Sequence, residues 1–142
     1  MLFIVTDFCY GGELFDYVLE RNYLSESDTK TIMKQCLSSL LYLNENNICH
    51  RDIKLENLML QNVADISNIK LIDFGLSRDV QQQSTIKSLC SGSPYYIAPE
   101  VIKNQLSMAC DIWSLGVVMY ICLVGKLPFP GESTEEVFHN VQ

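Results

Sequence analysis

The stretch that decides the fold of this chain lies at positions 50–57 and reads His50-Arg51-Asp52-Ile53-Lys54-Leu55-Glu56-Asn57. Taken singly, its polar residues have ordinary explanations, because Asp52 could cap a helix or turn and Asn57 could lie in a turn. Two more short motifs follow in order, Asp73-Phe74-Gly75 and Ala98-Pro99-Glu100. Three ordered motifs within about 50 residues are not expected by chance, so the spacing predicts one shared functional site.

This ordered set resembles the signature motifs of eukaryotic serine/threonine protein kinases, in which an aspartate and a tryptophan follow as Asp111 and Trp113 do here. Lys54 is typical of the serine/threonine class, and the wording of residues 11–16 and 97–102 is most similar to calmodulin- or calcium-dependent kinases. The resemblance runs over residues 1–142, yet it implies only part of the family's domain, namely the hinge and most of the C-lobe.

The resemblance implies ATP and Mg²⁺ as cofactors and a role for each polar residue of the motifs. Asp52 is expected to accept the proton of the substrate hydroxyl, and Lys54 to place a positive charge at the γ-phosphate. Asn57 and Asp73 are expected to bind Mg²⁺ through oxygen, the donor that this ion prefers. Ser93 matches the hydroxyl residue that bridges the catalytic aspartate and lysine, although a serine before Pro94 is also an ordinary turn residue.

Residues 2–13 are similar to the kinase hinge, which holds the adenine ring. By that resemblance Thr6 lies beside the base, the backbone of Asp7 and Cys9 hydrogen-bonds it, and Met59 forms part of the pocket floor. Glu13 closes this segment and is counted with the nucleotide-binding residues. Short strand-turn-helix segments are common, so this assignment depends on the motifs downstream.

The expected partners are protein substrates that carry serine or threonine. Glu13 and Glu56 occupy positions where kinases that prefer basic peptides hold an arginine upstream of the phosphoacceptor, although an exposed glutamate is often only a solvated surface residue. Arg51 is expected to bind a phosphate on the activation loop. That loop offers Ser84, Thr85, Ser88 and Ser91, of which Ser88 and Ser91 are the rival activation sites.

Composition excludes several other classes of protein. With 10 basic and 17 acidic residues the net charge is −7, so the basic face of a nucleic-acid binder is not visible. The longest apolar run, Ile112–Val124, is shorter than the roughly 20 residues that span a bilayer, and it predicts a fully buried helix instead. The six cysteines form no CxxC pair, which disfavours a structural metal site or a disulfide framework and favours a cytoplasmic or other reducing compartment.

The periodicity predicts a mainly α-helical domain with a small β hairpin, as in a kinase C-lobe without its N-lobe. A short strand is expected at residues 2–6, and helices at 13–20, 27–44 and 111–124. The hairpin is expected to pair Leu58–Leu60 with Ile69–Ile72, with residues 62–68 between them. A polar loop covers residues 78–94, and a further helix is expected after the Pro128–Gly131 turn.

Two functions remain open on the sequence. The first is a piece of an active serine/threonine kinase that is inactive in isolation, because no Gly-rich phosphate loop, strand lysine or regulatory-helix glutamate is found in these 142 residues. The second is a non-catalytic, kinase-like interaction module. Genomic sequence upstream of Met1 distinguishes them, since an in-frame Gly-rich loop and strand lysine would favour the enzyme.

Overall fold

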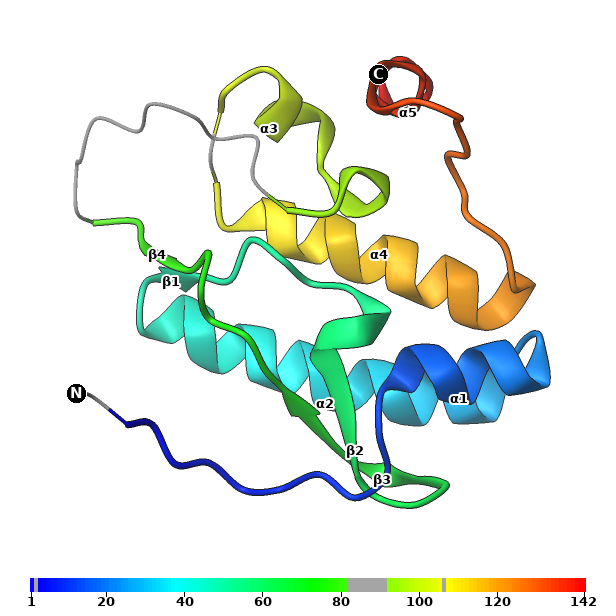
Figure 1. The fold of residues 1–142 in the computed structure, drawn as a ribbon. Coiled ribbons are helices and arrows are strands. Elements are labelled where there is room, and N and C mark those ends of the chain that lie inside the picture. The colour runs from blue at the N-terminus through cyan, green and yellow to red at the C-terminus, as the bar shows by residue number, and fades with distance from the viewer. Residues whose placement is uncertain (2, 82–91, 106) are drawn as a thin grey trace.

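The central feature of the computed structural model is a pair of helices that pack side by side, α2 (Glu26–Glu45) and α4 (Ala109–Val124) (Figure 1). The structure describes residues 1, 3–81, 92–105 and 107–142. The Ser25 hydroxyl caps α2 by accepting a hydrogen bond from the Asp28 amide at 3.1 Å. Both helices bury the side chains that face each other and the hairpin, and this interface is the main core.

Shorter elements surround this pair. The helices are α1 (Leu14–Arg21), α3 (Pro99–Ile102) and α5 (Thr134–Val141), with 3₁₀ turns η1 (Leu55–Asn57) and η2 (Pro94–Tyr96). The strands are β1 (Ile48–Cys49), β2 (Leu58–Asn62), β3 (Asp65–Leu71) and β4 (Arg78–Asp79). The expected mainly helical architecture with a small antiparallel hairpin is confirmed, and the predicted helix after the Pro128–Gly131 turn is α5.

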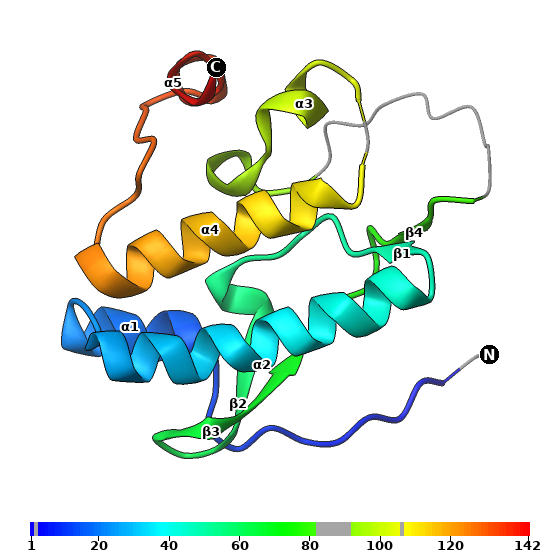
Figure 2. The ribbon, with the colours of Figure 1, turned by 180° about the vertical axis from the view of Figure 1, so that it is seen from behind.

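The β2–β3 hairpin packs on α2, as both ribbon views show (Figures 1 and 2). Leu58 pairs with Leu71 and Leu60 with Ile69, so that their apolar side chains face α2. Gln35 of α2 fixes the hairpin, because its side chain donates to the Ile66 carbonyl and accepts from the Ile69 amide, both at 2.8 Å. The turn is shorter than predicted: only residues 63 and 64 separate the strands.

The strand predicted at residues 2–6 is not observed over residues 3–6, and residue 2 lies outside the described residues. A strand needs a neighbour that takes up its backbone N–H and C=O groups. Among the described residues no such neighbour lies beside residues 3–6. The first pairing comes later, where the amides of Tyr10 and Gly11 donate to the carbonyls of Gln61 and Leu60 at 3.0 Å.

The prediction that Ile112–Val124 forms a fully buried helix is also wrong in part. Helix α4 buries one side, including Leu115, Val118 and Cys122, but leaves Ile112 52% exposed and Met119 44% exposed. In the part of the chain that the structure describes, α2 and the 3₁₀ turn η2 cover one side of α4 and nothing comparable covers the other. No helix among the described residues is both long and apolar enough to cross a bilayer.

Candidate active site

The segment at residues 50–57 is held in place by one buried carboxylate, that of Asp111 in the first turn of α4. Its Oδ2 accepts a hydrogen bond from the His50 amide at 2.7 Å, and its Oδ1 accepts one from the Arg51 amide at 2.8 Å. Asp111 is 3% exposed. This one carboxylate therefore joins the start of α4 to residues 50 and 51. Arg51 itself has φ 72°, a left-handed conformation that is unfavourable for a side chain of this size and that surrounding contacts must stabilise.

The His50 ring links the segment at residues 50–57 to the residue after β3 through hydrogen bonds. Its Nδ1 accepts from the Asp52 amide at 3.3 Å, so Nε2 carries the hydrogen and donates to the Ile72 carbonyl at 3.0 Å. Burial lowers the pKa of the His50 imidazole, because the charged form loses its water. The ring of Phe74 packs edge-on against it, with centroids 4.8 Å apart. His50 and Phe74 therefore pack against each other beside the loop.

Asp52, Lys54, Asn57 and Ser93 form one hydrogen-bonded cluster. The Lys54 Nζ lies 2.9 Å from Asp52 Oδ2 and donates to the Ser93 hydroxyl at 3.1 Å. The Asn57 Nδ2 donates to the Asp52 Oδ2 at 3.0 Å and to the Asp52 carbonyl at 2.8 Å. Among the described residues no donor reaches Asp52 Oδ1. The cluster therefore leaves one carboxylate oxygen available to take a proton, with a cation beside it.

Asp73 follows directly after the residue that pairs with Asn57, because the Ile72 amide donates to the Asn57 carbonyl at 3.0 Å. Asp73 is exposed, has φ 60° and accepts the Gly75 amide through Oδ1 at 3.1 Å. Both Asn57 amide hydrogen bonds use its nitrogen, so its side-chain oxygen remains free to bind a cation. Oxygen donors of this kind suit Mg²⁺, and the donor set fits the ion that the sequence implied.

The hinge residues lie on an exposed segment. Thr6 and Asp7 are exposed and Cys9 is half-buried, and the Phe8 carbonyl accepts a hydrogen bond from the Gln61 side chain at 2.9 Å. Glu13 and Met59 form an isolated antiparallel bridge, so the segment runs beside β2 as it enters α1. Their roles toward a nucleotide stay predictions.

Arg51 is half-buried and its guanidinium donates to the Leu76 carbonyl at 3.4 Å. Its neighbourhood is stabilised by an antiparallel pair that the sequence did not predict, in which Ile48 and Cys49 of β1 oppose Asp79 and Arg78 of β4. Two-residue strands carry no usable periodicity, so nothing in the sequence could have identified them. The hydroxyl residues that the activation loop offers, Ser84, Thr85, Ser88 and Ser91, lie outside the described residues.

A groove of about 360 Å³ opens between α1, η1, η2 and the end of α4. Glu56 and Tyr96 line it, whereas Glu13 is not among its lining residues. Tyr96, which sequence reasoning missed, interacts with the Glu56 side chain, and its hydroxyl pKa is raised by burial and then by the Glu56 charge. Among the residues that the structure describes, the buried Glu56 Oε2 atom has no hydrogen-bond partner.

Comparison with known proteins places this geometry in context. The protein kinase domain model matches residues 1–142. "Calcium-dependent protein kinase 5" of Plasmodium berghei is 43% identical over 141 residues, which are 99% of this chain and 25% of that protein. "Probable serine/threonine-protein kinase MARK-C" of Dictyostelium discoideum is 43% identical over 140 residues, 97% of this chain and 18% of that protein. The chain thus spans a quarter or less of the length of these relatives.

Proposed function

This chain belongs to the protein kinase family, and we propose that it carries the catalytic residues of a serine/threonine kinase that transfers the γ-phosphate of ATP to protein hydroxyls. The observation that carries this proposal is the cluster of Asp52, Lys54, Asn57 and Ser93, whose members contact one another at 2.9–3.1 Å. A protein that only bound partners would have no need of a buried aspartate with a free oxygen beside a lysine.

The mechanism follows from the hydrogen bonds of this cluster. Lys54 and Asn57 both bind Asp52 Oδ2, which fixes the carboxylate and directs Oδ1 toward an incoming hydroxyl. Oδ1 then orients that hydroxyl and accepts its proton as the oxygen attacks phosphorus. The Lys54 ammonium, held between Asp52 and Ser93, stabilises negative charge on the transferred group. Positioning of this kind supplies most of the catalysis in phosphoryl transfer.

Asn57 and Asp73 would hold Mg²⁺, which neutralises phosphate charge when bound. Asn57 contributes its side-chain oxygen and Asp73 the carboxylate oxygen that is not occupied by the Gly75 amide. The extended hinge segment and Met59 would provide the surface on which the adenine ring rests. The proposed setting is the cytoplasm or another reducing compartment.

Substitution of Asp52 tests the proposed function directly. Asp52→Asn keeps the size of the side chain but removes the proton acceptor, and general-base loss typically costs about 10²–10⁴-fold in rate. We expect kcat of the protein that contains this chain to fall by that factor, with KM for ATP little changed. The measurement is radiolabelled phosphate incorporation into a serine peptide. Asp16→Asn, at an exposed position of α1, is the matched control. Equal activity of the two variants would reject Asp52 as the proton acceptor, whereas no activity in the unsubstituted protein would favour the interaction module.

We further propose that the groove at Glu56 binds an arginine upstream of the phosphoacceptor. A guanidinium would satisfy the unpaired Glu56 Oε2, and hydrogen bonds to charged groups contribute about 1.5–3 kcal/mol. Glu56→Gln is therefore expected to reduce the preference for an arginine peptide over its alanine counterpart by about 10- to 100-fold in kcat/KM. Glu45→Gln, exposed at the end of α2, controls for the loss of one negative charge. An unchanged preference in Glu56→Gln would reject this site.

A further inference from the structure

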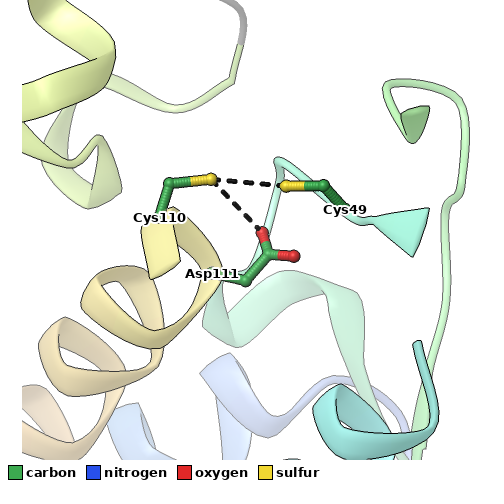
Figure 3. Close-up of side chains that lie close together, drawn as sticks. All are labelled: Cys49, Cys110 and Asp111. Atoms are coloured by element: carbon green, nitrogen blue, oxygen red, sulfur yellow. Dashed lines mark hydrogen bonds between the residues drawn. The ribbon is translucent and has the colours of Figure 1, made fainter. Parts of the chain in front are cut away.

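Two cysteine sulfurs are in contact next to the site at residues 50–57. Cys49 Sγ, at the end of β1, lies 3.4 Å from Cys110 Sγ, in the first turn of α4 (Figure 3). Cys49 is 0% exposed and Cys110 is 5% exposed. Among the described cysteines this is the only pair whose sulfur atoms are in contact. Burial and then the nearby Cys122 raise the pKa of the Cys36 thiol, but no contact between their sulfurs is seen in the described residues.

We propose that Cys49 and Cys110 form a reversible disulfide when a hydroperoxide oxidises them. A disulfide bond is about 2.05 Å long, so the sulfurs need to approach by roughly 1.4 Å. Cys49 and Cys110 are 61 positions apart in sequence. Their neighbours already join the two parts of the chain, because Asp111 accepts hydrogen bonds from the His50 and Arg51 amides. The covalent bond would add a third link between α4 and the catalytic loop. This proposal is independent of the proposed function.

Access of the oxidant distinguishes the two thiols. Cys110 lines a small cavity of about 20 Å³, together with Asp52, Ser93 and Ser114. Cys49 does not line this cavity and is 0% exposed, whereas Cys110 is 5% exposed, so Cys110 is the thiol nearer to an incoming peroxide. The hydrogen bond with Cys110, then burial and the nearby Asp111 charge, raise the pKa of the Cys49 thiol, so its thiolate is disfavoured. We therefore expect peroxide to oxidise Cys110 first, and the Cys49 sulfur then to attack the oxidised Cys110.

The reaction balances in two steps. Cys110–SH reacts with hydrogen peroxide, the O–O bond breaks, and the products are Cys110–SOH and one water. The Cys49 sulfur then attacks the Cys110 sulfur, the S–O bond breaks, and the Cys49 proton leaves with the hydroxyl as a second water. Peroxide is reduced and the two thiols are oxidised by two electrons in total. A thiol such as glutathione reverses the reaction by exchange, which suits a transient bond in a reducing compartment.

A metal ion held by Cys49, Cys110 and Asp111 is the competing interpretation of this cluster. The Asp111 carboxylate already accepts two backbone amides, at 2.7 and 2.8 Å. Binding a metal through Asp111 would compete with both hydrogen bonds and loosen the loop that they hold. Two thiols alone leave a zinc ion short of its usual four ligands. The contact therefore favours sulfur–sulfur chemistry.

The test is peroxide treatment of the folded chain in the presence of a chelator, followed by denaturation, alkylation of free thiols and peptide mapping. Trypsin alone is uninformative, because it leaves Cys36 with Cys49 in residues 35–51 and Cys110 with Cys122 in residues 104–126. Added chymotrypsin separates them at Tyr42 and at Trp113 or Tyr120. We expect a Cys49–Cys110 linked peptide lighter by two hydrogens, loss of alkylation at both residues, and full recovery after dithiothreitol.

Two variants test the order of the steps. Cys49→Ala is expected to leave Cys110 as a sulfenic acid that a dimedone probe labels, whereas Cys110→Ala is expected to lose both the link and the label. The Cys36–Cys122 pair is the internal control and is expected to stay alkylated. The proposal is overturned if wild-type Cys49 and Cys110 remain alkylated while circular dichroism shows a folded chain, if other cysteines are linked instead, or if omission of the chelator reveals bound metal that protects both thiols.

Discussion

Replacement of Asp111 by alanine is expected to destabilise the fold by about 2–6 kcal/mol. The substitution removes the acceptor of two backbone amides, those of His50 and Arg51, which bind it at 2.7 and 2.8 Å. Each buried donor that is left unpaired costs about 1–3 kcal/mol. A domain of this size is typically stable by only about 5–15 kcal/mol, so a large share of the stability depends on this one carboxylate.

Equilibrium urea unfolding followed by circular dichroism measures the effect. Glu45→Ala, exposed at the end of α2, is the control, and surface substitutions of this kind usually change stability by less than about 0.5 kcal/mol. Should Asp111→Ala unfold at the same urea concentration as Glu45→Ala, the two hydrogen bonds would contribute little, and another contact would have to hold residues 50 and 51.

The sequence predicted one shared site at residues 50–57 because the motif places several polar groups within a few residues. Asp52, Lys54 and Asn57 are adjacent in sequence and therefore adjacent in space, and the structure adds the hydrogen bonds among them. The two long helices were likewise predicted, α2 from the spacing of its apolar residues and α4 from its long apolar run. Patterns of this kind predict structure well because they depend only on residues that are close in sequence.

The errors arose where a local pattern depends on distant partners. Residues 3–6 are apolar like a strand, but a strand forms only when another strand pairs with it. Ile112 and Met119 belong to an apolar run, and their exposure depends on which elements cover α4, which composition cannot show. The interaction of Glu56 with Tyr96 and the Cys49–Cys110 contact join residues 40 and 61 positions apart, so no spacing rule could have found them.

Residues 1–142 on their own are expected to give no measurable peptide phosphorylation, although the cluster around Asp52 is complete. Correct positioning of reactants can account for about 7–11 kcal/mol of a reaction barrier. In the described part of the chain, Thr6 and Asp7 lie on an exposed segment, and no element covers a nucleotide placed there. These 142 residues also contain no Gly-rich loop or strand lysine to fix the phosphates from above.

The experiment supplies the isolated 142-residue polypeptide with Mg²⁺-ATP and a basic serine peptide, and follows phosphate incorporation over hours. Asp52→Asn in the same polypeptide is the blank, and circular dichroism with a urea transition confirms that the wild-type polypeptide is folded. Without that check, inactivity could reflect unfolding. We expect the polypeptide to be folded but inactive, because Asp52 and Lys54 can orient a hydroxyl but cannot hold the phosphoryl group in line with it. Turnover above the blank would show that these residues position ATP without further help, and the argument from missing phosphate contacts would then be wrong.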